Sequence, residues 1–253
     1  MRIAAAGDLH FDRHSRGRLS GHLEKLKDRA DFLLLAGDLT QVGHGDEGLV
    51  LAQELATSPV PVIAVFGNHD YHSEQEQLIR RALEQAKVTV LESQVARLEV
   101  RKIGVGIVGL KGFGGGFVGA CATDFGEAET KAFVRTTKRA AHFIREALRV
   151  VDADYKIVLL HYAPVSGTLH GENREIYPFL GSYLLGEAMD QGGADLVVHG
   201  HAHSGIERGE TPGGVPVRNV AQHVIRHVFN IYTLDKFGLL VRQEVEPQTR
   251  GQH

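Results

Sequence analysis

The stretch from Val197 to His203, Val-Val-His-Gly-His-Ala-His, places three histidines at alternate positions at the end of an apolar run. Residues two apart in an extended chain point to the same side, and neutral imidazole is the commonest protein metal ligand. Gly200 leaves the backbone free to bend. We therefore expect His201 and His203 to reach neighbouring points of one metal site. We expect His199 either to pack into the end of the strand or to contact a metal ligand without binding the metal itself.

The same pattern, a short apolar run followed by residues of metal-ligand type, recurs upstream. In α/β sheets the carboxyl ends of the strands form the functional edge, so we expect these side chains to converge on one rim. That rim would hold two carboxylates, one amide and up to five imidazoles. The upstream clusters are Gly7-Asp8-Leu9-His10, Gly37-Asp38-Leu39-Thr40, Gly67-Asn68-His69-Asp70 and His161.

The N-terminal third of the chain alternates continuous apolar runs with amphipathic segments. This alternation indicates βαβ units and a sheet that is buried on both faces. We expect strands at residues 2–6, 32–36 and 62–66, each followed by a helix, at 20–28, 47–56 and 73–86. The last helix is expected to begin with a capping box formed by Ser73 and Glu76.

Further along, short apolar runs at 88–90, 97–100 and 105–108 indicate hairpins that begin a second sheet, with a turn at Arg101-Lys102. Helices are expected at 127–150 and 182–191, and the final strands, at 215–217, 228–234 and 239–245, look antiparallel. The sequence therefore predicts an α/β protein with one domain over residues 1–247, two sheets and outer helices. Residues 248–253 are expected to form a frayed polar tail.

Composition excludes several classes of protein. The 253 residues include a single cysteine, Cys121, so no intramolecular disulfide and no thiolate zinc cluster can form. The formal net charge of -3 provides no general attraction for nucleic acid or an anionic membrane. The N-terminal apolar run ends at Asp8 and is too short for a signal peptide. We expect a cytoplasmic protein with a small-molecule substrate, no membrane and no nucleic acid partner, and the oligomeric state stays open.

The number of candidate donors points to a dinuclear site. Seven donors exceed the needs of one tetrahedral ion and suit two cations that share a carboxylate. Manganese, iron and zinc accept imidazole together with carboxylate, and the sequence does not choose among them. Two metals held about 3.5–4 Å apart clamp the attacking and leaving oxygens of a phosphoryl displacement.

Taken in order, the clusters resemble the five-part signature of the calcineurin-like metallophosphoesterases. The matching pieces span residues 8 to 203, and each follows an apolar strand; they are Asp8-x-His10, Gly37-Asp38, Gly67-Asn68-His69-Asp70, His161 and Gly200-His201-Ala202-His203. The resemblance implies a four-layer α/β/β/α sandwich of two mixed sheets flanked by helices. It also implies a site for two divalent or trivalent metal ions.

The resemblance further assigns roles to these residues. His69 would stabilise the phosphoryl oxygens and protonate the leaving alkoxide. From adjacency we expect Asp70 to orient His69 by accepting a hydrogen bond. The implied ligands are Asp8, His10 and His203 for the first metal, Asn68, His161 and His201 for the second, and Asp38 as the bridge between them.

The activity implied by the resemblance is hydrolysis of a phosphoester by in-line attack of a metal-bridging hydroxide. We favour a phosphodiesterase acting on small or cyclic nucleotide-type substrates. The alternatives are a phosphomonoesterase, a nucleotide pyrophosphatase or a non-catalytic metal-binding scaffold. The segment 163–181 follows His161 directly, and we expect its residues His170, Arg174 and Tyr177 to contact the substrate.

Other readings of the same residues remain open. Asp8 or Asp38, taken alone, is also suited to cap a following helix. The pattern Gly104-x-Gly106-x-x-Gly109 matches the dinucleotide-binding motif. We reject that interpretation because no helix begins at the end of the pattern. The Gly-rich stretch 112–119 is either a surface loop or a flap over the site.

Overall fold

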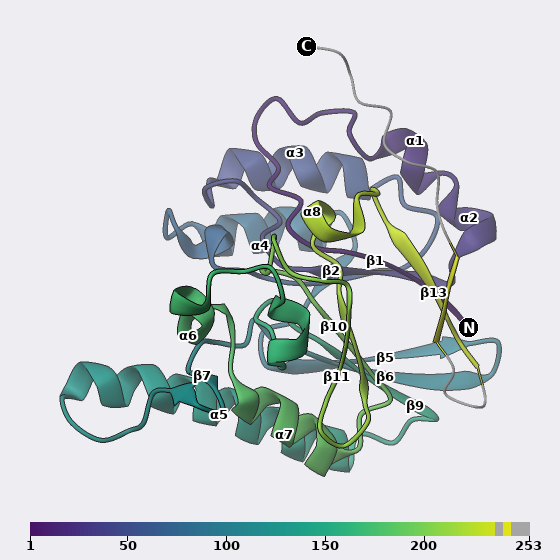
Figure 1. The fold of residues 1–253 in the computed structure, drawn as a ribbon. Coiled ribbons are helices and arrows are strands. Elements are labelled where there is room, and N and C mark those ends of the chain that lie inside the picture. The colour runs from purple at the N-terminus through teal and green to yellow at the C-terminus, as the bar shows by residue number, and fades with distance from the viewer. Residues whose placement is uncertain (236–239, 244–253) are drawn as a thin grey trace.

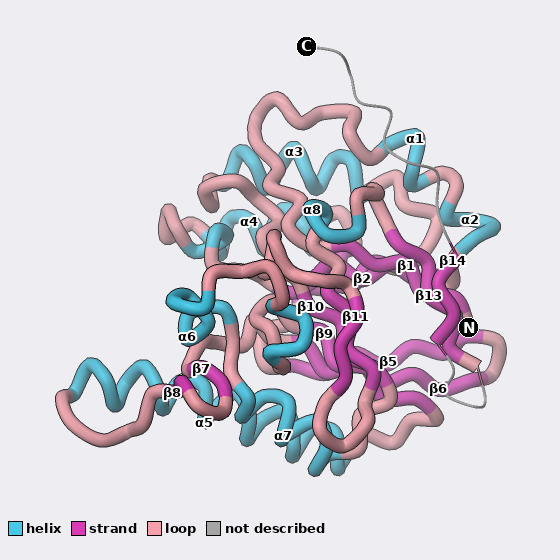
Figure 2. Tube along the Cα trace, viewed as in Figure 1, coloured by secondary structure: helices cyan, strands magenta, loops and turns pink. Residues whose placement is uncertain are grey.

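The computed structural model describes residues 1–235 and 240–243, and it consists of two mixed six-stranded sheets with helices on their outer faces. Figure 2 shows the two groups of strands, in magenta, lying between outer helices, in cyan. The architecture is the predicted four-layer α/β/β/α sandwich. The end of the predicted strand 239–245, the domain boundary at 247 and the tail at 248–253 lie outside the described residues.

The first sheet carries the N-terminal ligand clusters. Its strand order is β14-β13-β1-β2-β3-β4, and β1, β2, β3 and β4 are mutually parallel. Strand β13 pairs antiparallel with both β1 and β14. The bounds are β1 (Arg2–Ala6), β2 (Phe32–Ala36), β3 (Val62–Val65), β4 (Val88–Val90), β13 (Asn230–Leu234) and β14 (Leu240–Gln243).

The second sheet carries the C-terminal ligand clusters. Its order is β11-β12-β10-β9-β6-β5, and the four strands from β12 to β6 run parallel. The expectation that the strand near 215–217 is antiparallel is wrong for its pairing with β10, because β12 is antiparallel to β11 alone. The bounds are β5 (Gln94–Val100), β6 (Ile103–Gly109), β9 (Tyr155–Leu159), β10 (Leu196–His199), β11 (Arg208–Glu210) and β12 (Pro216–Asn219).

Helices cover the outer face of each sheet (Figure 1). The first sheet is covered by α1 (Ser20–Leu23), α2 (Leu26–Arg29), α3 (Gly45–Leu55) and α4 (Glu76–Gln85), and the second by α5 (Ala128–Val150) and α7 (Tyr183–Gly192). Within the described ranges, no helix combines the length and apolar character needed to cross a membrane. The shorter elements are η1 (His69–Tyr71), η2 (Ser166–Leu169), η3 (Arg174–Ile176), α6 (Tyr177–Leu180), α8 (Gln222–Ile225), β7 (Gly116–Phe117) and β8 (Ala120–Cys121).

Strand periodicity explains how the two sheets share one interior. In β10, Val198 packs into the cluster between the sheets, and its neighbour Val197 packs beneath α5 and α7. Strand β9 alternates in the same way, with Ile157 between the sheets and Val158 beneath those helices. Successive side chains of a strand point to opposite faces, so a fully apolar strand is buried on both sides and its register brings the ligands to a common edge.

Two helix predictions are wrong in detail. The helix expected at 20–28 is broken into α1 and α2. The helix expected at 73–86 begins at Glu76 without a side-chain cap, because the Ser73 hydroxyl donates to the carbonyl of Val42 at 2.6 Å. The predicted turn at Arg101-Lys102 is confirmed, and both residues have positive φ. The stretch 104–109 lies in β6, paired antiparallel with β5, which confirms that it is not a dinucleotide fingerprint.

Candidate metal centre

The carboxyl ends of β1, β2 and β3 in one sheet meet those of β9 and β10 in the other. The two sheets are joined there by hydrogen bonds that involve the candidate ligands. The backbone N–H of His201 donates to Asp8 Oδ2 at 3.0 Å, and His161 Nδ1 contacts the carbonyl of Ala36 at 2.9 Å. Residues from both halves of the chain are thus held at one buried rim, since Asp8, Asp38 and His161 are almost fully buried.

Several candidate ligands at this rim have a strained backbone. Four candidate ligands have left-handed φ values, namely Asp8 (57°), His10 (45°), Asp38 (46°) and His201 (71°). Such conformations cost free energy for residues other than glycine and persist where the surrounding structure enforces them, often at functional sites. The strained turns bend the chain so that each ligand leaves its strand toward the rim.

The first cluster contains Asp8, His10 and His203. Their ligand atoms all lie within 4.8 Å of one another. His203 Nε2 lies 2.8 Å from Asp8 Oδ1. These are the residues that the resemblance implies for the first metal, and the structure brings them together from β1 and from the loop after β10.

The second cluster contains Asp38, His161 and His201, whose ligand atoms also lie within 4.8 Å of one another. His161 Nε2 lies 2.9 Å from Asn68 Oδ1 and 3.3 Å from Asp38 Oδ1. The other carboxylate oxygen of Asp38, Oδ2, lies 4.0 Å from His10 Nε2. Asp38 therefore stands between the two clusters, as a bridging ligand would.

The chemistry of the donors fits two metal ions. Both ring nitrogens of His10 are buried and have no hydrogen-bond partner among the described residues. An unpaired buried polar atom is costly, and a metal would satisfy one of these nitrogens. A Cβ built on Gly67 or Gly200 would overlap the carboxylate of Asp38 or Asp8, respectively, so glycine keeps this space open. Imidazole, carboxylate and amide donors together suit manganese, iron or zinc.

Burial and mutual charge set the protonation states at the rim. Burial lowers the pKa of His10 to about 4 and that of His201 to about 3, so both rings are neutral, which is the form that binds metal. Burial opposes the charged form of His161, but the carboxylate of Asp38 outweighs it and raises the pKa of His161 to about 9. Burial likewise opposes ionisation of Asp38, yet the facing histidines hold its pKa below its ordinary value.

Comparison with known protein families agrees with this arrangement. A family model described as calcineurin-like phosphoesterase matches residues 1–205, a range that includes every residue of both clusters. The chain belongs to the calcineurin-like phosphoesterase family. Membership supports a metal-dependent phosphoester hydrolase.

Solved structures share the fold of this phosphoesterase at low sequence identity. A phosphopantetheinyl hydrolase from Mycobacterium tuberculosis is 16% identical, with a TM-score of 0.65 over 99% of this chain and 98% of that chain. GAP50, the anchor in the inner membrane complex of Plasmodium, is 12% identical, with a TM-score of 0.61 over 98% and 89%. A putative 5'-nucleotidase from Staphylococcus aureus is 15% identical, with a TM-score of 0.58 over 96% of this chain and 52% of that chain. No curated protein sequence matches the chain significantly.

His69 lies at the solvent side of the phosphoesterase rim, and its ring is held by the backbone. Its Nδ1 lies 2.6 Å from the carbonyl oxygen of Gln41. Its Nε2 lies 3.9 Å from Asp38 Oδ2, and His69, His10 and Asp38 each offer a ligand atom within 4.8 Å of the other two. Because a carbonyl only accepts, Nδ1 must carry a proton. His69 is therefore oriented by Gln41, a residue that the sequence analysis did not identify.

The predicted hydrogen bond from His69 to Asp70 is wrong. Asp70 is fully buried, and its carboxylate accepts from the backbone N–H groups of Leu39, Thr40 and Gly67 and from the Thr40 hydroxyl. Burial and the nearby carboxylate of Asp38 raise the pKa of Asp70 to about 6. Asp70 therefore ties the turn after β3 to the turn after β2, and it supports Asp38 and His69 through the backbone.

Two further aromatic side chains pack against the candidate ligands. The ring of His223, from α8, stacks on His203 with centroids 4.3 Å apart and planes at 13°. The ring of Tyr162 lies 4.5 Å from that of His201. For Tyr162, the one feature of the sequence that could have indicated a place at the rim was its position next to His161. No pattern in the sequence indicated His223, because α8, which follows β12, reaches the rim only in the folded chain.

The predicted substrate contacts lie on a segment that borders the clusters. The carbonyl of Phe179 lies 3.2 Å from His201 Nε2, and Glu172 accepts from the N–H of Ser204, next to His203, at 2.7 Å. The Tyr177 hydroxyl donates to the carbonyl of Leu169 at 3.0 Å. Arg174 and His170 are exposed on the same segment. Their contact with substrate stays a prediction.

Two other predicted features are now placed. His199 is buried, with its ring nitrogens 2.7 Å from the carbonyl of Gly200 and 2.9 Å from Thr168 Oγ1, so it packs at the strand end as expected. The Gly-rich stretch 112–119 is fastened to the neighbouring segment, because Gly115 and Gly116 donate to backbone carbonyls at Pro178 and Gly181. That stretch is therefore tied to the segment whose carbonyl at Phe179 contacts His201.

Proposed function

We propose that this phosphoesterase hydrolyses small phosphodiesters at a dinuclear metal centre, with His69 as the general acid. The observation that carries the proposal is the placement of His69 Nε2, 3.9 Å from the Asp38 carboxylate that stands between the clusters. When bound, two metal ions would activate a water molecule and neutralise phosphoryl oxygens. Asp8, His10 and His203 would hold one ion, Asn68, His161 and His201 would hold the other, and Asp38 would contact both.

The hydrogen bond to Gln41 determines which ring nitrogen of His69 is free to transfer a proton. Since Nδ1 is committed to the carbonyl of Gln41, the proton available for transfer is the one on Nε2. The imidazolium form of His69 donates that proton to the departing alkoxide oxygen and becomes the neutral Nδ1–H tautomer. The ring keeps its orientation throughout, because the bond to Gln41 is unchanged.

The charge of the surrounding side chains favours a diester over a monoester. A monoester dianion carries one more negative charge than a diester monoanion. In the described part of the chain, no Arg or Lys side chain forms a hydrogen bond or ion pair with a residue of either cluster. With no Arg or Lys bonded to either cluster to offset the second negative charge of a monoester, the singly charged diester is the better match. Small or cyclic nucleotide-type diesters are the substrates that we propose.

The test compares bis-p-nitrophenyl phosphate with p-nitrophenyl phosphate, using chelator-stripped protein with Mn²⁺, Fe²⁺ or Zn²⁺ added back. We expect metal-dependent cleavage that is faster for the diester. His69→Ala is expected to lower kcat by about 10²–10⁴-fold for an alkyl diester, whose leaving group needs a proton, and by less for the nitrophenyl diester. His72→Ala, at an exposed position, is the matched control.

Three outcomes would contradict parts of this proposal. Preferential cleavage of the monoester would assign the protein as a phosphomonoesterase. Wild-type turnover of an alkyl diester by His69→Ala would exclude the acid role. Two bound metals without any hydrolysis would indicate a scaffold, although this chain keeps the complete ligand set together with His69. The cytoplasmic location expected from the sequence remains a prediction.

A further inference from the structure

The rim that carries the metal clusters continues past them on the side of Asn68 and His161. Strand β4 lies parallel beside β3, and β6 lies parallel beside β9, so the residues that follow β4 and β6 emerge at the same edge. Those residues are Glu92 and Lys111. The carbonyl of Lys111 accepts from the N–H groups of His161 and Tyr162 at 3.0 and 3.1 Å. Lys111 is thereby fixed next to a candidate ligand of the second metal.

A cavity of about 360 Å³ opens at this position. It is bounded by the end of β6, the turn after β4 and the middle of α5. Tyr71, two residues beyond His69, contributes an aromatic wall. The polar side chains around the cavity are those of Tyr71, Glu92, Ser93, Lys111, Thr136 and Arg139.

The positive groups of this cavity form no ion pair with any carboxylate of the described residues. The half-buried ammonium of Lys111 lies 4.1 Å from the centroid of the Tyr71 ring, and none of the described carboxylates lies within ion-pair distance of it. The guanidinium of Arg139 donates to Thr136 Oγ1 at 3.2 Å, and it too pairs with no carboxylate in the described ranges. Burial lowers the pKa of Lys111, against the opposing carboxylates of Glu92, Asp38 and Asp70.

The one carboxylate that lines the cavity is already engaged. Glu92 accepts hydrogen bonds from Arg80 and from the Tyr71 hydroxyl. The cavity therefore presents the half-buried ammonium of Lys111, the exposed guanidinium of Arg139 and a carboxylate that is paired with Arg80. A partly buried cation that has lost hydration without a partner is best compensated by an anion.

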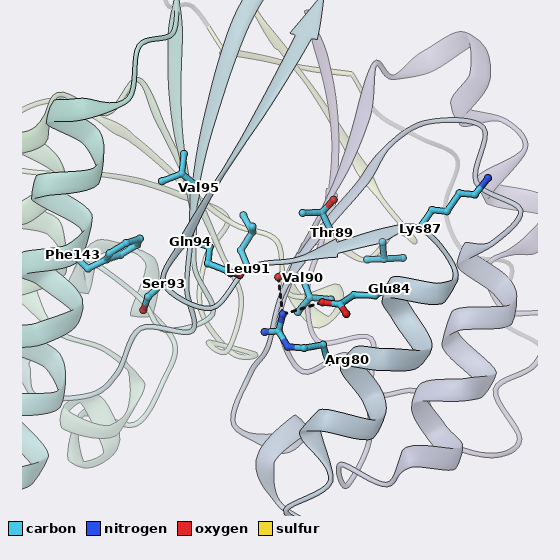
Figure 3. Close-up of a pocket in the computed structure, with 11 residues that line it drawn as sticks. Arg80, Glu84, Lys87, Thr89, Val90, Leu91, Ser93, Gln94, Val95 and Phe143 are labelled. Carbon is cyan, nitrogen blue, oxygen red and sulfur yellow. Dashed lines mark hydrogen bonds and ion pairs between the residues drawn. The ribbon is translucent and has the colours of Figure 1, made fainter.

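A neighbouring groove also contains basic side chains, but their surroundings differ from those of Lys111. It lies beside β4 and β5, and Figure 3 shows its lining. There Arg80 is turned toward the carbonyl of Val90 and toward Glu84, at 3.1 and 3.3 Å, and Lys87 extends away from the other residues drawn. The cations of that groove are thus either bonded, as Arg80 is, or exposed to solvent, as Lys87 is, whereas the cavity at Lys111 contains a half-buried ammonium without an ion pair.

We propose that the cavity at Lys111 and Arg139 is a subsite for a second phosphate group of the substrate. This inference rests on the proposed function, since the scissile phosphodiester would lie at the metal clusters. The Lys111 ammonium and the forked guanidinium of Arg139 would hold the second phosphate by charge-assisted hydrogen bonds. The substrate class is accordingly a phosphodiester that carries a further terminal phosphate.

The kinetic test uses the dinucleotides ApA and pApA, which share one phosphodiester and differ in a terminal phosphate. For the wild type we expect a kcat/KM at least about tenfold higher for pApA, because hydrogen bonds between charged groups are among the strong ones. Lys111→Met and Arg139→Gln should each bring the ratio of the two kcat/KM values toward one. Lys111→Arg, which keeps the charge, should retain most of the ratio, and Lys87→Met, in the neighbouring groove, should retain all of it.

Binding of pyrophosphate to the metal-free protein separates this inference from the proposed function. Calorimetry should show binding that Lys111→Met weakens about tenfold or more, with melting curves confirming that the variant is folded. If the wild type hydrolyses neither dinucleotide but Lys111→Met still weakens pyrophosphate binding, the proposed activity fails and the subsite stands. If Lys111→Met and Arg139→Gln alter neither the ratio nor pyrophosphate binding, the subsite is refuted.

Discussion

At the scale of single residues, glycine decides whether the rim can form. Each of Asp8, Asp38, Asn68 and His201 directly follows a glycine in the sequence. Gly37 has a φ of +80°, and a Cβ there would overlap the ring of His161. Glycine is the one residue without a Cβ, so it allows backbone and ligands from different strands to approach more closely than any other residue type would.

Gly67→Ala tests this role of glycine. The added methyl group would overlap the carboxylate and backbone of Asp38, so we expect Asp38 to move out of position. Metal affinity should fall by at least about tenfold, in the range seen when groups that orient ligands are removed. Calorimetric titration with Mn²⁺ measures the change. Gly21→Ala, where the new Cβ meets nothing within 4 Å outside its chain neighbours and its own helix backbone, is the control. Equal metal affinity in the two variants would contradict the prediction.

The sequence could predict which residues gather at the rim but not every contact that they make. His69 and Asp70 are adjacent, and adjacency suggested that one orients the other. Both lie in the 3₁₀ turn η1, in which successive side chains project in directions about a third of a turn apart. Asp70 therefore points to the backbone of the β2 loop, and His69 points outward to Gln41. The turn after β2 lies alongside η1 and decides that Asp70, and not His69, faces the interior.

At the scale of elements, the loop that follows β1 is held by one buried side chain. Glu54, on α3, accepts from the backbone N–H groups of Gly17, Leu19 and Ser20 and from the Ser20 hydroxyl. These donors lie at the N-terminal end of α1, where backbone N–H groups have no partner within the helix. The carboxylate therefore caps α1 from a different helix. Burial opposes its ionisation, but these donors lower the pKa of Glu54 below the ordinary value of 4.5.

This cap predicts a pH-dependent contribution to stability. A carboxyl group with a lowered folded-state pKa stabilises the protein above its unfolded-state pKa, and the contribution is lost as the pH falls through the folded-state value. Glu54→Gln should therefore reduce the free energy of unfolding by about 1–3 kcal/mol at pH 7. The difference from the wild type should shrink below pH 4.5. Thermal melts from pH 3 to 8 test this, with the exposed substitution Glu24→Gln as control; a difference independent of pH would contradict the prediction.

Elements were predictable where periodicity was strong and local. The buried strands at 2–6 and 32–36 match β1 and β2, and the long charged segment at 127–150 matches α5 to within one residue. The segment 20–28 has helical spacing, yet it divides at Glu24-Lys25 into two short helices. Its first turn is anchored to Glu54, 34 residues later in the chain, and no local pattern records that contact.

At the scale of the whole molecule, the candidate metal centre joins the two sheets. Asp8, His10 and Asp38 come from the first sheet, and His161 and His201 come from the second. Ligands that bind only the folded state stabilise it by mass action. Metal binding should therefore stabilise the entire sandwich, because the halves cannot separate without losing donors to both ions.

Addition of metal should raise the melting temperature. At a hundredfold excess of Mn²⁺ over Kd, the stabilisation is about 2.7 kcal/mol per site, which corresponds to an increase in Tm of about 5–10 °C for a chain of this size. Chelator should reverse the increase. His10→Ala should show a smaller increase, whereas His14→Ala, at an exposed position outside the clusters, should match the wild type. Equal increases in both variants would exclude His10 as a ligand.

The sequence by itself determined the fold class, the family resemblance and the residues that gather at the rim. Each of these depends on short-range features: apolar runs with the period of strands, and ligand residues directly after them. Only the tertiary structure decided how those residues pair. It placed Asp70 on the backbone, Gln41 on His69, His223 on His203, and Lys111 beside a cavity next to His161. Such contacts join residues far apart in the chain, and their distances follow from strand order and register, which no local pattern encodes.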